Sequence, residues 1–207
     1  SGRPCQPEAF QPGERRLAYA EGASALPKHL ARGLEVRLST RVARGTVAGA
    51  AVRLEPESGE AVEAGTAVLA LAPEEAERLL AAFADPPPPL ATARALLAMA
   101  RSEPCLALGA LYPAGTPAPA WQVSYPEASR VLQLVSCESS KRPAAGRLAL
   151  VLQAHPRWSR ERLDDPAWPA ELLVEAARLL GPWARHPEAS HPHRWRHARS
   201  DRSAEMA

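Results

Sequence analysis

The sequence lacks several features that identify common classes of protein. No apolar run approaches the roughly 20 residues of a membrane-spanning helix, and residues 1–7 are not the apolar stretch of a signal peptide. The three cysteines, Cys5, Cys105 and Cys137, are an odd number without a CxxC pair, which argues against a disulfide framework or a zinc site. We therefore expect a cytosolic protein in which Cys105 and Cys137, set among apolar residues, are buried thiols.

Lysine is also scarce, because Lys28 and Lys141 are the only two in the chain. The formal net charge is +2, from 25 basic and 23 acidic residues, which is too balanced to indicate nucleic acid or an anionic membrane as the main partner. Hydrophobic residues make up 46% and charged residues 23% of the chain, as in globular proteins with a real core. The net charge therefore does not indicate a class of ligand. Because lysine is rare in this chain, Lys141 is a candidate functional residue.

Residues 1–84 contain patterns for helices and strands. Apolar and polar residues alternate over 34–39, which predicts a half-buried strand. The apolar run 67–72 has no polar face, which is typical of a strand buried on both sides in a parallel sheet. The predicted elements in chain order are a helix at 22–33, strands at 34–39, 47–54 and 61–63 around a turn at 57–60, the buried strand at 67–72 and a helix at 73–83.

Four successive prolines at 86–89 interrupt these patterns and predict the start of a second lobe at residue 85. The clearest helix of this lobe spans 165–181, with Asp165 as its cap and Gly181 at its end. One helix laid across an antiparallel sheet makes a two-layer α+β lobe. The other predicted elements of the lobe are a helix at 90–100 and strands at 105–111, 131–136 and 147–154.

The order and spacing of several motifs resemble a known family. The motifs are residues 22–33 followed by 36–42, the strand 67–73, Glu138-Ser-Ser-Lys141 with Gly146-Arg147 and 153–159, and His193-Arg-Trp-Arg-His-Ala-Arg199. Together they span roughly residues 20–199 and are similar to the flavin amine oxidase superfamily, most of all to bacterial renalase-like FAD-dependent amine oxidoreductases. That resemblance implies an α+β protein with a substrate lobe of antiparallel or mixed sheet, flanked by helices.

Two parts of the family pattern are missing from this sequence. No GxGxxG turn, which would cradle the FAD pyrophosphate, occurs among its glycines, and the chain ends before the family's late Gly-Asp segment. The resemblance then implies a fragment, with 1–84 as the trailing part of an incomplete Rossmann-like FAD domain, 85–199 as the substrate-binding lobe and 200–207 as a tail. FAD is expected in the full-length family and is doubtful for this chain alone.

The resemblance also suggests site residues, although none is assigned a catalytic role. Val42 matches a position whose backbone meets the FAD adenine, and the alternative is an ordinary strand valine. Lys141 follows two serines in a turn and could face an anionic or carbonyl-bearing ligand, the alternative being a solvated loop lysine. Arg194, Trp195 and His197 lie in the tail motif, which in the family borders the substrate cavity, and Trp195 is the preferred pocket-wall residue.

Other functions find weaker support in the sequence. Imidazoles at short spacing make a metal chemically possible, but no carboxylate or cysteine completes a compact ligand set, so we expect none. A basic, aromatic nucleic-acid surface at 194–199 is disfavoured by the balanced charge. No G-x-S-x-G elbow, phosphate loop or carboxylate pair is present. The imidazoles considered as metal ligands are those of His186, His191, His193 and His197. Separately, the tryptophans expected as packing anchors are Trp121, Trp158, Trp168 and Trp183.

Two functional hypotheses follow from these observations. The first is the substrate-domain part of an FAD-dependent oxidoreductase that acts on a small molecule, an amine or a dihydronicotinamide, and is inactive alone. The second is a non-catalytic interaction module that pairs with a separate flavin-binding partner or with itself. In both cases the flavin would carry the redox chemistry, and the protein would supply orientation and a dry cavity.

Overall fold

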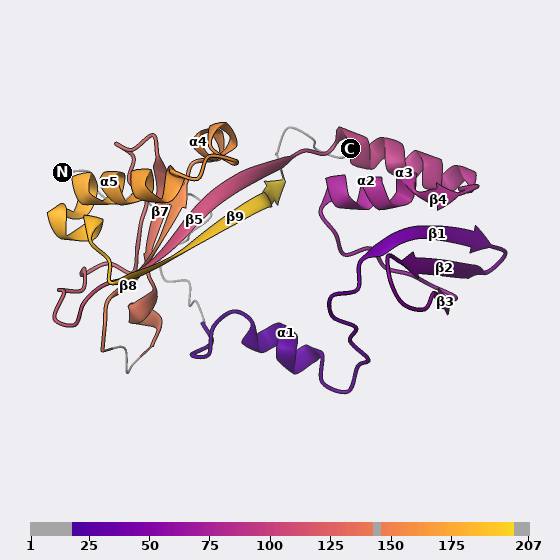
Figure 1. Ribbon diagram of the computed structural model, residues 1–207, viewed down its shortest axis with the longest axis horizontal. Coiled ribbons are helices and arrows are strands. Elements are labelled where there is room, and N and C mark those ends of the chain that lie inside the picture. Colours follow the sequence, from indigo (N-terminus) through magenta and orange to yellow (C-terminus); the bar gives the residue numbers. More distant parts are fainter. Residues whose placement is uncertain (1–17, 143–145, 201–207) are drawn as a thin grey trace, which may run out of the picture. The chain divides into compact units, whose positions relative to one another are not determined.

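The computed structural model describes residues 18–142 and 146–200, which form the helices and strands in Figure 1. The chain divides into two compact units. We call them the five-stranded unit, with described residues 18–32, 104–142 and 146–196, and the four-stranded unit, with described residues 33–103 and 197–200. Each unit combines a sheet with helices, so the predicted α+β class is confirmed.

The five-stranded sheet has the strand order β6-β7-β8-β5-β9. Its central pairs are antiparallel, β8 pairing with both β5 and β7, as predicted for this half of the chain. The strands are β5 (Ser102–Leu111), β6 (Val123–Ser124), β7 (Leu132–Cys137), β8 (Ala149–Ala154) and β9 (Ala189–Ser200), and the helices are α1 (Ala25–Leu30), α4 (Pro156–Glu161), α5 (Trp168–Leu180) and the 3-10 helices η1 (Glu138–Lys141) and η2 (Pro182–Arg185).

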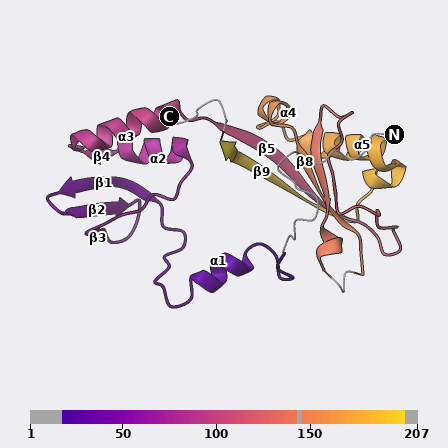
Figure 2. The same cartoon turned by 180° about the vertical axis from the view of Figure 1, so that it is seen from behind.

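One face of this sheet carries the main hydrophobic core. Leu108 of β5 pairs with Leu152 of β8, and both side chains are fully buried because alternate residues of each strand point to the same side. Helix α5 covers this face with Trp168 and Leu172, also fully buried, and the two opposite views in Figures 1 and 2 both place α5 against the strands. Trp158 joins the same core, while Trp121 and Trp183 are partly buried against it, so the four predicted anchors are confirmed.

Helix α5 begins and ends where local chemistry dictates. The carboxylate of Asp165 accepts a hydrogen bond from the backbone N–H of Ala167 at 2.8 Å, which satisfies a donor just before the first turn. Gly181 follows the last helical residue with a φ of 115°, a left-handed value that residues with a Cβ avoid. The predicted helix at 165–181 is confirmed with the shorter bounds 168–180, but its N-cap is Ala167, whose side chain makes no cap hydrogen bond, and not the predicted Asp165.

The four-stranded sheet has the order β3-β2-β1-β4, in which β1 pairs antiparallel with β2 and parallel with β4. A tight turn at Gly49, with a φ of 60°, joins β1 to β2 and divides the stretch 47–54 that the sequence predicted as a single strand. The elements are β1 (Val42–Ala48), β2 (Ala51–Pro56), β3 (Val62–Ala64), β4 (Phe83–Ala84) and the helices α2 (Pro73–Ala81) and α3 (Pro88–Met99).

The prediction of strands at 34–39 and 67–72 is wrong. Both segments are irregular, and their apolar side chains are exposed to solvent, with 82% of Leu38 and 85% of Val68 accessible. A strand needs neighbours for its backbone hydrogen bonds, and no described strand pairs with either segment. The apolar patterns of both segments are present in the sequence, but they do not provide a neighbouring strand for backbone hydrogen bonds.

The packing units do not coincide with the predicted lobes. Helix α3 begins within the four prolines, at Pro88, and packs against α2 in the four-stranded unit, where Arg94 of α3 bonds Glu77 of α2 at 2.9 Å. After α3 the chain passes to the five-stranded unit between residues 103 and 104, and not at residue 85. The functional division into 1–84 and 85–199 stays a prediction, and most of the predicted tail, 201–207, lies outside the described residues.

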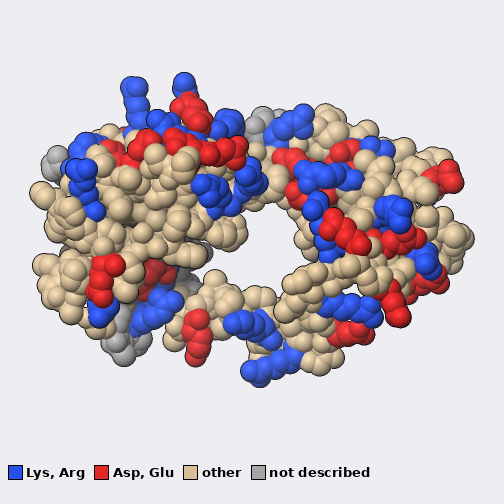
Figure 3. All heavy atoms as spheres, viewed as in Figure 1, with Lys and Arg blue, Asp and Glu red and all other residues tan. Residues whose placement is uncertain are grey.

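The surface of the four-stranded unit carries charges of both signs side by side, as Figure 3 shows. Arg44 and Arg53 of the hairpin bond Glu55 and Glu63 at 3.0 and 2.7 Å. Exposed pairs of this kind contribute about 0–1 kcal/mol each, so they add solubility more than stability. In the part of the chain that the structure describes, no helix is both long and apolar enough to cross a bilayer. Cys105 and Cys137 are buried thiols as predicted, and Cys5 lies outside the described residues.

Candidate functional site

Strand β9 shows which face of the five-stranded sheet is open. The Arg194 side chain reaches the helical side, where its Nε donates to the Leu163 carbonyl at 2.9 Å and its guanidinium lies 5.6 Å from the Trp168 ring centroid. Because side chains alternate along a strand, Trp195 points to the opposite side. We call this opposite side, away from the core with α5, the open face.

A row of small and polar residues crosses the open face. Val151 of β8 pairs with Gly109 of β5 on one side and with Ser136 of β7 on the other. A Cβ atom placed on Gly109 would lie 3.9 Å from the Cβ of His191, which puts His191 of β9 on the same face. A hollow of about 280 Å³ lies over this row, lined by Gly109, Ala110, Leu111, Glu138, Ala149, Leu150, Val151, Ala189, Ser190 and His191.

Aromatic side chains extend the open face along β9. His193 and Trp195 point to the same side as His191, and their ring centroids are 4.3 Å apart with the planes tilted by 58°. Trp195 is 53% exposed, which is a large accessible area for an aromatic side chain. The open face therefore offers a small apolar hollow beside two exposed aromatic rings, the composition expected of a small-molecule site.

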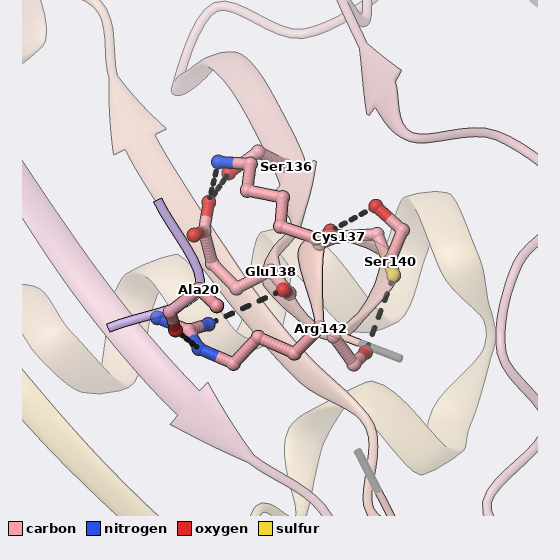
Figure 4. A network of polar contacts seen from close by, with 8 residues as sticks. Ala20, Ser136, Cys137, Glu138, Ser140 and Arg142 are labelled. Atoms are coloured by element: carbon pink, nitrogen blue, oxygen red, sulfur yellow. Dashed lines mark hydrogen bonds and ion pairs between the residues drawn. The ribbon is translucent and has the colours of Figure 1, made fainter. Parts of the chain in front are cut away.

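A polar network closes the hollow at η1, where the chain leaves β7 (Figure 4). The Oε1 atom of Glu138 accepts hydrogen bonds from Ser136 Oγ at 2.6 Å and from Lys141 Nζ at 2.5 Å. Arg142 donates to the backbone carbonyls of Glu138, at 3.3 Å, and Ala20, at 3.1 Å. These contacts fix the Glu138 carboxylate at the edge of the hollow and fasten the segment before α1 to the same unit.

The network keeps Glu138 ionised. Burial by itself would raise the pKa of this carboxyl, but the hydrogen bonds from Lys141 and Ser136 and the charges of Lys141 and Arg142 outweigh it and hold the pKa below the ordinary value. The carboxylate is charged at neutral pH, but the adjoining ammonium and guanidinium compensate that charge. The edge of the hollow is therefore a hydrogen-bonding group of low net charge.

A first prediction concerns acid stability. Because the pKa of Glu138 is lowered in the folded state, its contribution to stability is present above the ordinary glutamate pKa and is lost as the pH falls through the lowered value. We expect the Glu138→Gln variant to lose less thermal stability than the wild type between about pH 5 and pH 3, by less than about 1 kcal/mol because the side chain is partly exposed. Melting temperatures measured across this range, with the exposed Glu127→Gln as control, check it, and an unchanged slope for Glu138→Gln contradicts it.

The structure distributes the predicted site residues over both units. Lys141 lies at the edge of the hollow through Glu138, and Trp195 lies on the open face, whereas Arg194 points to the helical side of the same sheet. His197 and Val42 belong to the four-stranded unit, where His197 lies beside Glu74 of α2. Among the described residues no group of three metal-ligating side chains converges.

The sequence drew attention to His191 and His193 only as metal ligands and did not single out Gly109 or Ser136. Their shared place depends on pairing between strands far apart in the sequence, which no local pattern reveals. The sequence does place His191, His193 and Trp195 at alternate positions, the spacing that brings side chains to one face if the segment is a strand.

Val42 borders a second hollow, in the four-stranded unit, of about 460 Å³. Its walls are the start of β1, the exposed apolar segment at 68–71 and one side of α2, including Glu75 and Arg78. No glycine-rich turn lies here to cradle a pyrophosphate, and the Glu75 carboxylate in the first turn of α2 opposes an anion. The described residues therefore do not make a complete FAD site.

Comparison with known proteins decides the family. A family model for flavin containing amine oxidoreductases matches residues 7–205. The chain belongs to this amine oxidoreductase family. Full-length members of the family carry FAD. Comparison with curated protein sequences gave no significant match.

Solved structures of amine oxidoreductases share the fold. A putrescine oxidase bound to putrescine is similar with a TM-score of 0.63 and 20% identity over 83% of this chain and 38% of its own. Cyclohexylamine oxidase from Brevibacterium oxydans has a TM-score of 0.62 and 19% identity. The match covers 84% of this chain and 38% of that protein. A putative protoporphyrinogen oxidase from Exiguobacterium has a TM-score of 0.66 and 13% identity. The match covers 88% of this chain and 40% of that protein. The present chain thus spans about two fifths of the length of these three structures.

Proposed function

We propose that this chain is the substrate-binding part of a renalase-like, FAD-dependent oxidoreductase that oxidises an amine or NAD(P)H in the cytosol, and that it is inactive alone. The observation that carries the proposal is the hollow on the open face of the five-stranded sheet, in a chain matched to the flavin-containing amine oxidoreductase family. The bound flavin would accept the hydride. This chain's own residues bind and orient the substrate.

Each part of the open face has a role in this proposal. Gly109 and Val151 form the floor, and the absence of a side chain at Gly109 leaves room above the strand. Trp195, with His193 tilted against it, offers an aromatic wall that excludes water from one side of a bound molecule. Lys141 and Glu138 supply hydrogen bonds at the opposite edge, with Lys141 free to direct further donors at an acceptor on the ligand.

Flavin binding is tested by the visible absorbance of the purified chain before and after addition of FAD. We expect a colourless protein from which added FAD is removed completely by desalting, because the pyrophosphate cradle is missing from the sequence. Addition of putrescine or NADH to the mixture should then give no flavin bleaching above that of free FAD. Flavin absorbance that stays with the protein in a one-to-one ratio would contradict the claim that the chain is inactive alone.

Substrate binding is tested separately, by amide chemical-shift changes on titration with small amines and with NADH. We expect the shifts to be confined to the residues lining the hollow on the open face. A Gly109→Leu variant, which fills that hollow, should weaken binding at least tenfold, equivalent to about 1.4 kcal/mol. Ala50→Leu, at an exposed turn of the other unit, is the control. Equal binding by the wild type and Gly109→Leu would place the ligand elsewhere.

The alternative function is a non-catalytic module that pairs with a separate flavin-binding protein. The exposed apolar segments of the four-stranded unit favour it, because Leu34, Leu38 and Val68 are 68%, 82% and 85% accessible and offer a surface that pairing would bury. Self-association through the same segments is the competing possibility. Sedimentation of the purified chain at several concentrations separates them, since a strictly monomeric chain favours a foreign partner and a concentration-dependent dimer favours self-association.

A further inference from the structure

The apolar segment 67–72 of the four-stranded unit leaves its backbone groups open. It leads from β3 to α2 as a coil (Figure 1), and no described strand pairs with it. From residue 66 to residue 71, no backbone N–H or carbonyl is hydrogen-bonded to another described residue. Its side chains are open as well, because Val68 is 85% and Leu71 49% accessible. The segment is therefore an apolar strand sequence without a backbone partner in this unit.

The surroundings of this segment carry balanced charge. Residues 68–71 form one wall of the hollow of about 460 Å³, whose other walls are the start of β1 and one side of α2. The charged residues of its lining are two arginines and two glutamates, which form ion pairs with each other. Arg41 lies 3.3 Å from Glu57, and Arg78 lies 2.8 Å from Glu75. A second molecule that approaches the segment therefore meets no field of a single sign.

Other exposed extended segments carry features that discourage pairing with another chain. Proteins protect strand edges from such pairing with charged side chains and prolines. The segment 34–39 contains Glu35 and Arg37, joined at 2.8 Å, and the edge strand β9 contains Pro192. The segment 67–72 contains no charge, proline or glycine, the composition of segments that pair with copies of themselves.

A second copy of the chain fits the segment as an antiparallel strand, because it carries the same open backbone groups. In a pair centred between Leu69 and Ala70, Val68 of one copy lies opposite Leu71 of the other. Both faces of the segment are apolar, so this pairing buries no charge. The acidic first turn of α2 follows the segment directly. Antiparallel pairing keeps the two acidic turns at opposite ends, whereas parallel pairing would set like charges side by side.

We propose that residues 67–72 are a self-association site, through which two copies of this chain pair as antiparallel strands about a two-fold axis. Each copy supplies the backbone hydrogen bonds that the segment lacks within its own unit. Val68 and Leu71 are then buried against the other copy, and the two-fold symmetry closes the assembly at two chains. The pairing requires neither flavin nor substrate, so it stands or falls separately from the proposed function.

Hydrogen exchange of the full chain at two concentrations tests the pairing. Sedimentation in the presence of a reducing agent, which keeps Cys5 from linking two copies, first identifies a mainly monomeric and a mainly dimeric concentration. Alternate residues of a strand bond to a given neighbour, so about half of the amides at 67–72 face the second copy. We expect these amides to be protected about tenfold more at the dimeric concentration, and those at 34–39 to be unchanged.

Two matched variants test the segment itself. Val68→Lys places a charge in the paired strand and should raise the dissociation constant of the dimer at least about tenfold. Leu38→Lys makes the same change at a side chain that is 82% accessible in the same unit and should leave the dissociation constant unchanged. Ala70→Pro removes a backbone donor instead of adding a charge, and should also weaken the dimer. Circular dichroism of each monomer verifies that the fold is retained.

Several results would overturn the self-association site. Two need only the wild type, namely a chain that stays monomeric at every concentration and a dimer in which the amides at 67–72 remain unprotected. A dimer of folded Val68→Lys as tight as that of Leu38→Lys would place the contact elsewhere. A series of ever larger species would exclude a closed two-fold pair. Protection of 67–72 only in a complex with a different protein would assign the surface to a foreign partner.

Discussion

Replacement of Trp168 by alanine is expected to destabilise the five-stranded unit by about 3–5 kcal/mol, the usual cost of removing a large buried aromatic side chain. Trp168 is fully buried at the start of α5, packed with Leu172 and the sheet residues of the core. The Arg194 guanidinium of β9 also lies over its ring, so the substitution removes contacts that both α5 and β9 make with this side chain. Since a domain is typically stable by only 5–15 kcal/mol, the variant should unfold at a far lower denaturant concentration, measured by circular dichroism.

Two further variants sharpen this test. The indole N–H of Trp168 is buried without a hydrogen-bond partner among the described residues, and an unsatisfied donor costs about 1–3 kcal/mol. Trp168→Phe removes that donor with part of the ring, so it should cost much less than Trp168→Ala. Trp195→Ala, at a half-exposed tryptophan of the same unit, should stay within about 0.5 kcal/mol of the wild type. Similar losses from Trp168→Ala and Trp195→Ala would refute the assignment of the core.

Replacement of Gly45 by alanine is expected to cost the four-stranded unit about 1–3 kcal/mol, as overpacking of a core does. Gly45 pairs with Phe83 where β1 meets β4, and the buried Phe83 ring covers the glycine. A Cβ atom at position 45 would lie 2.4 Å from Cζ of Phe83, far inside van der Waals contact. The ring would have to move away from the sheet, and thermal unfolding should report the loss.

A double-mutant cycle separates this clash from a general effect of the substitution. In a Phe83→Ala background the ring is gone, so Gly45→Ala should cost little, giving a coupling of about 0.5–3 kcal/mol between the two positions. Gly65→Ala is the matched control, because the nearest atom to its added Cβ is the Ala50 carbonyl at 4.0 Å. Additive losses at positions 45 and 83 would contradict the packing described for β1 and β4.

Local chemistry made several elements predictable. Helix α5 has an apolar stripe that ends at a glycine, so its existence and its end followed from the sequence, whereas it begins three residues after the predicted cap, Asp165. The strands β5, β7 and β8 followed from short apolar runs separated by turn residues. In each case residues close together in the chain supply the interactions that define the element.

The failures have the opposite character. The segments at 34–39 and 67–72 carry strand patterns, yet a strand exists only where another backbone bonds to it, and that is decided by distant residues. The turn at Gly49 between β1 and β2 was not predicted, because both strands and the turn contain small apolar residues. Phe83 extended an apolar stripe and so was assigned to the helix, whereas the structure places it in β4.

By itself the sequence determined the α+β class, the buried thiols, the tryptophan anchors and the motifs that indicated the amine oxidoreductase family. Only the tertiary structure decided which side chains meet. It separated Arg194 from Trp195 by strand alternation, placed Gly109, Ser136 and His191 in one row, and set His197 between Glu74 and Glu75. The physical reason is that propensity and capping act over a few residues, whereas a site is assembled by strand pairing and packing between residues that the sequence keeps far apart.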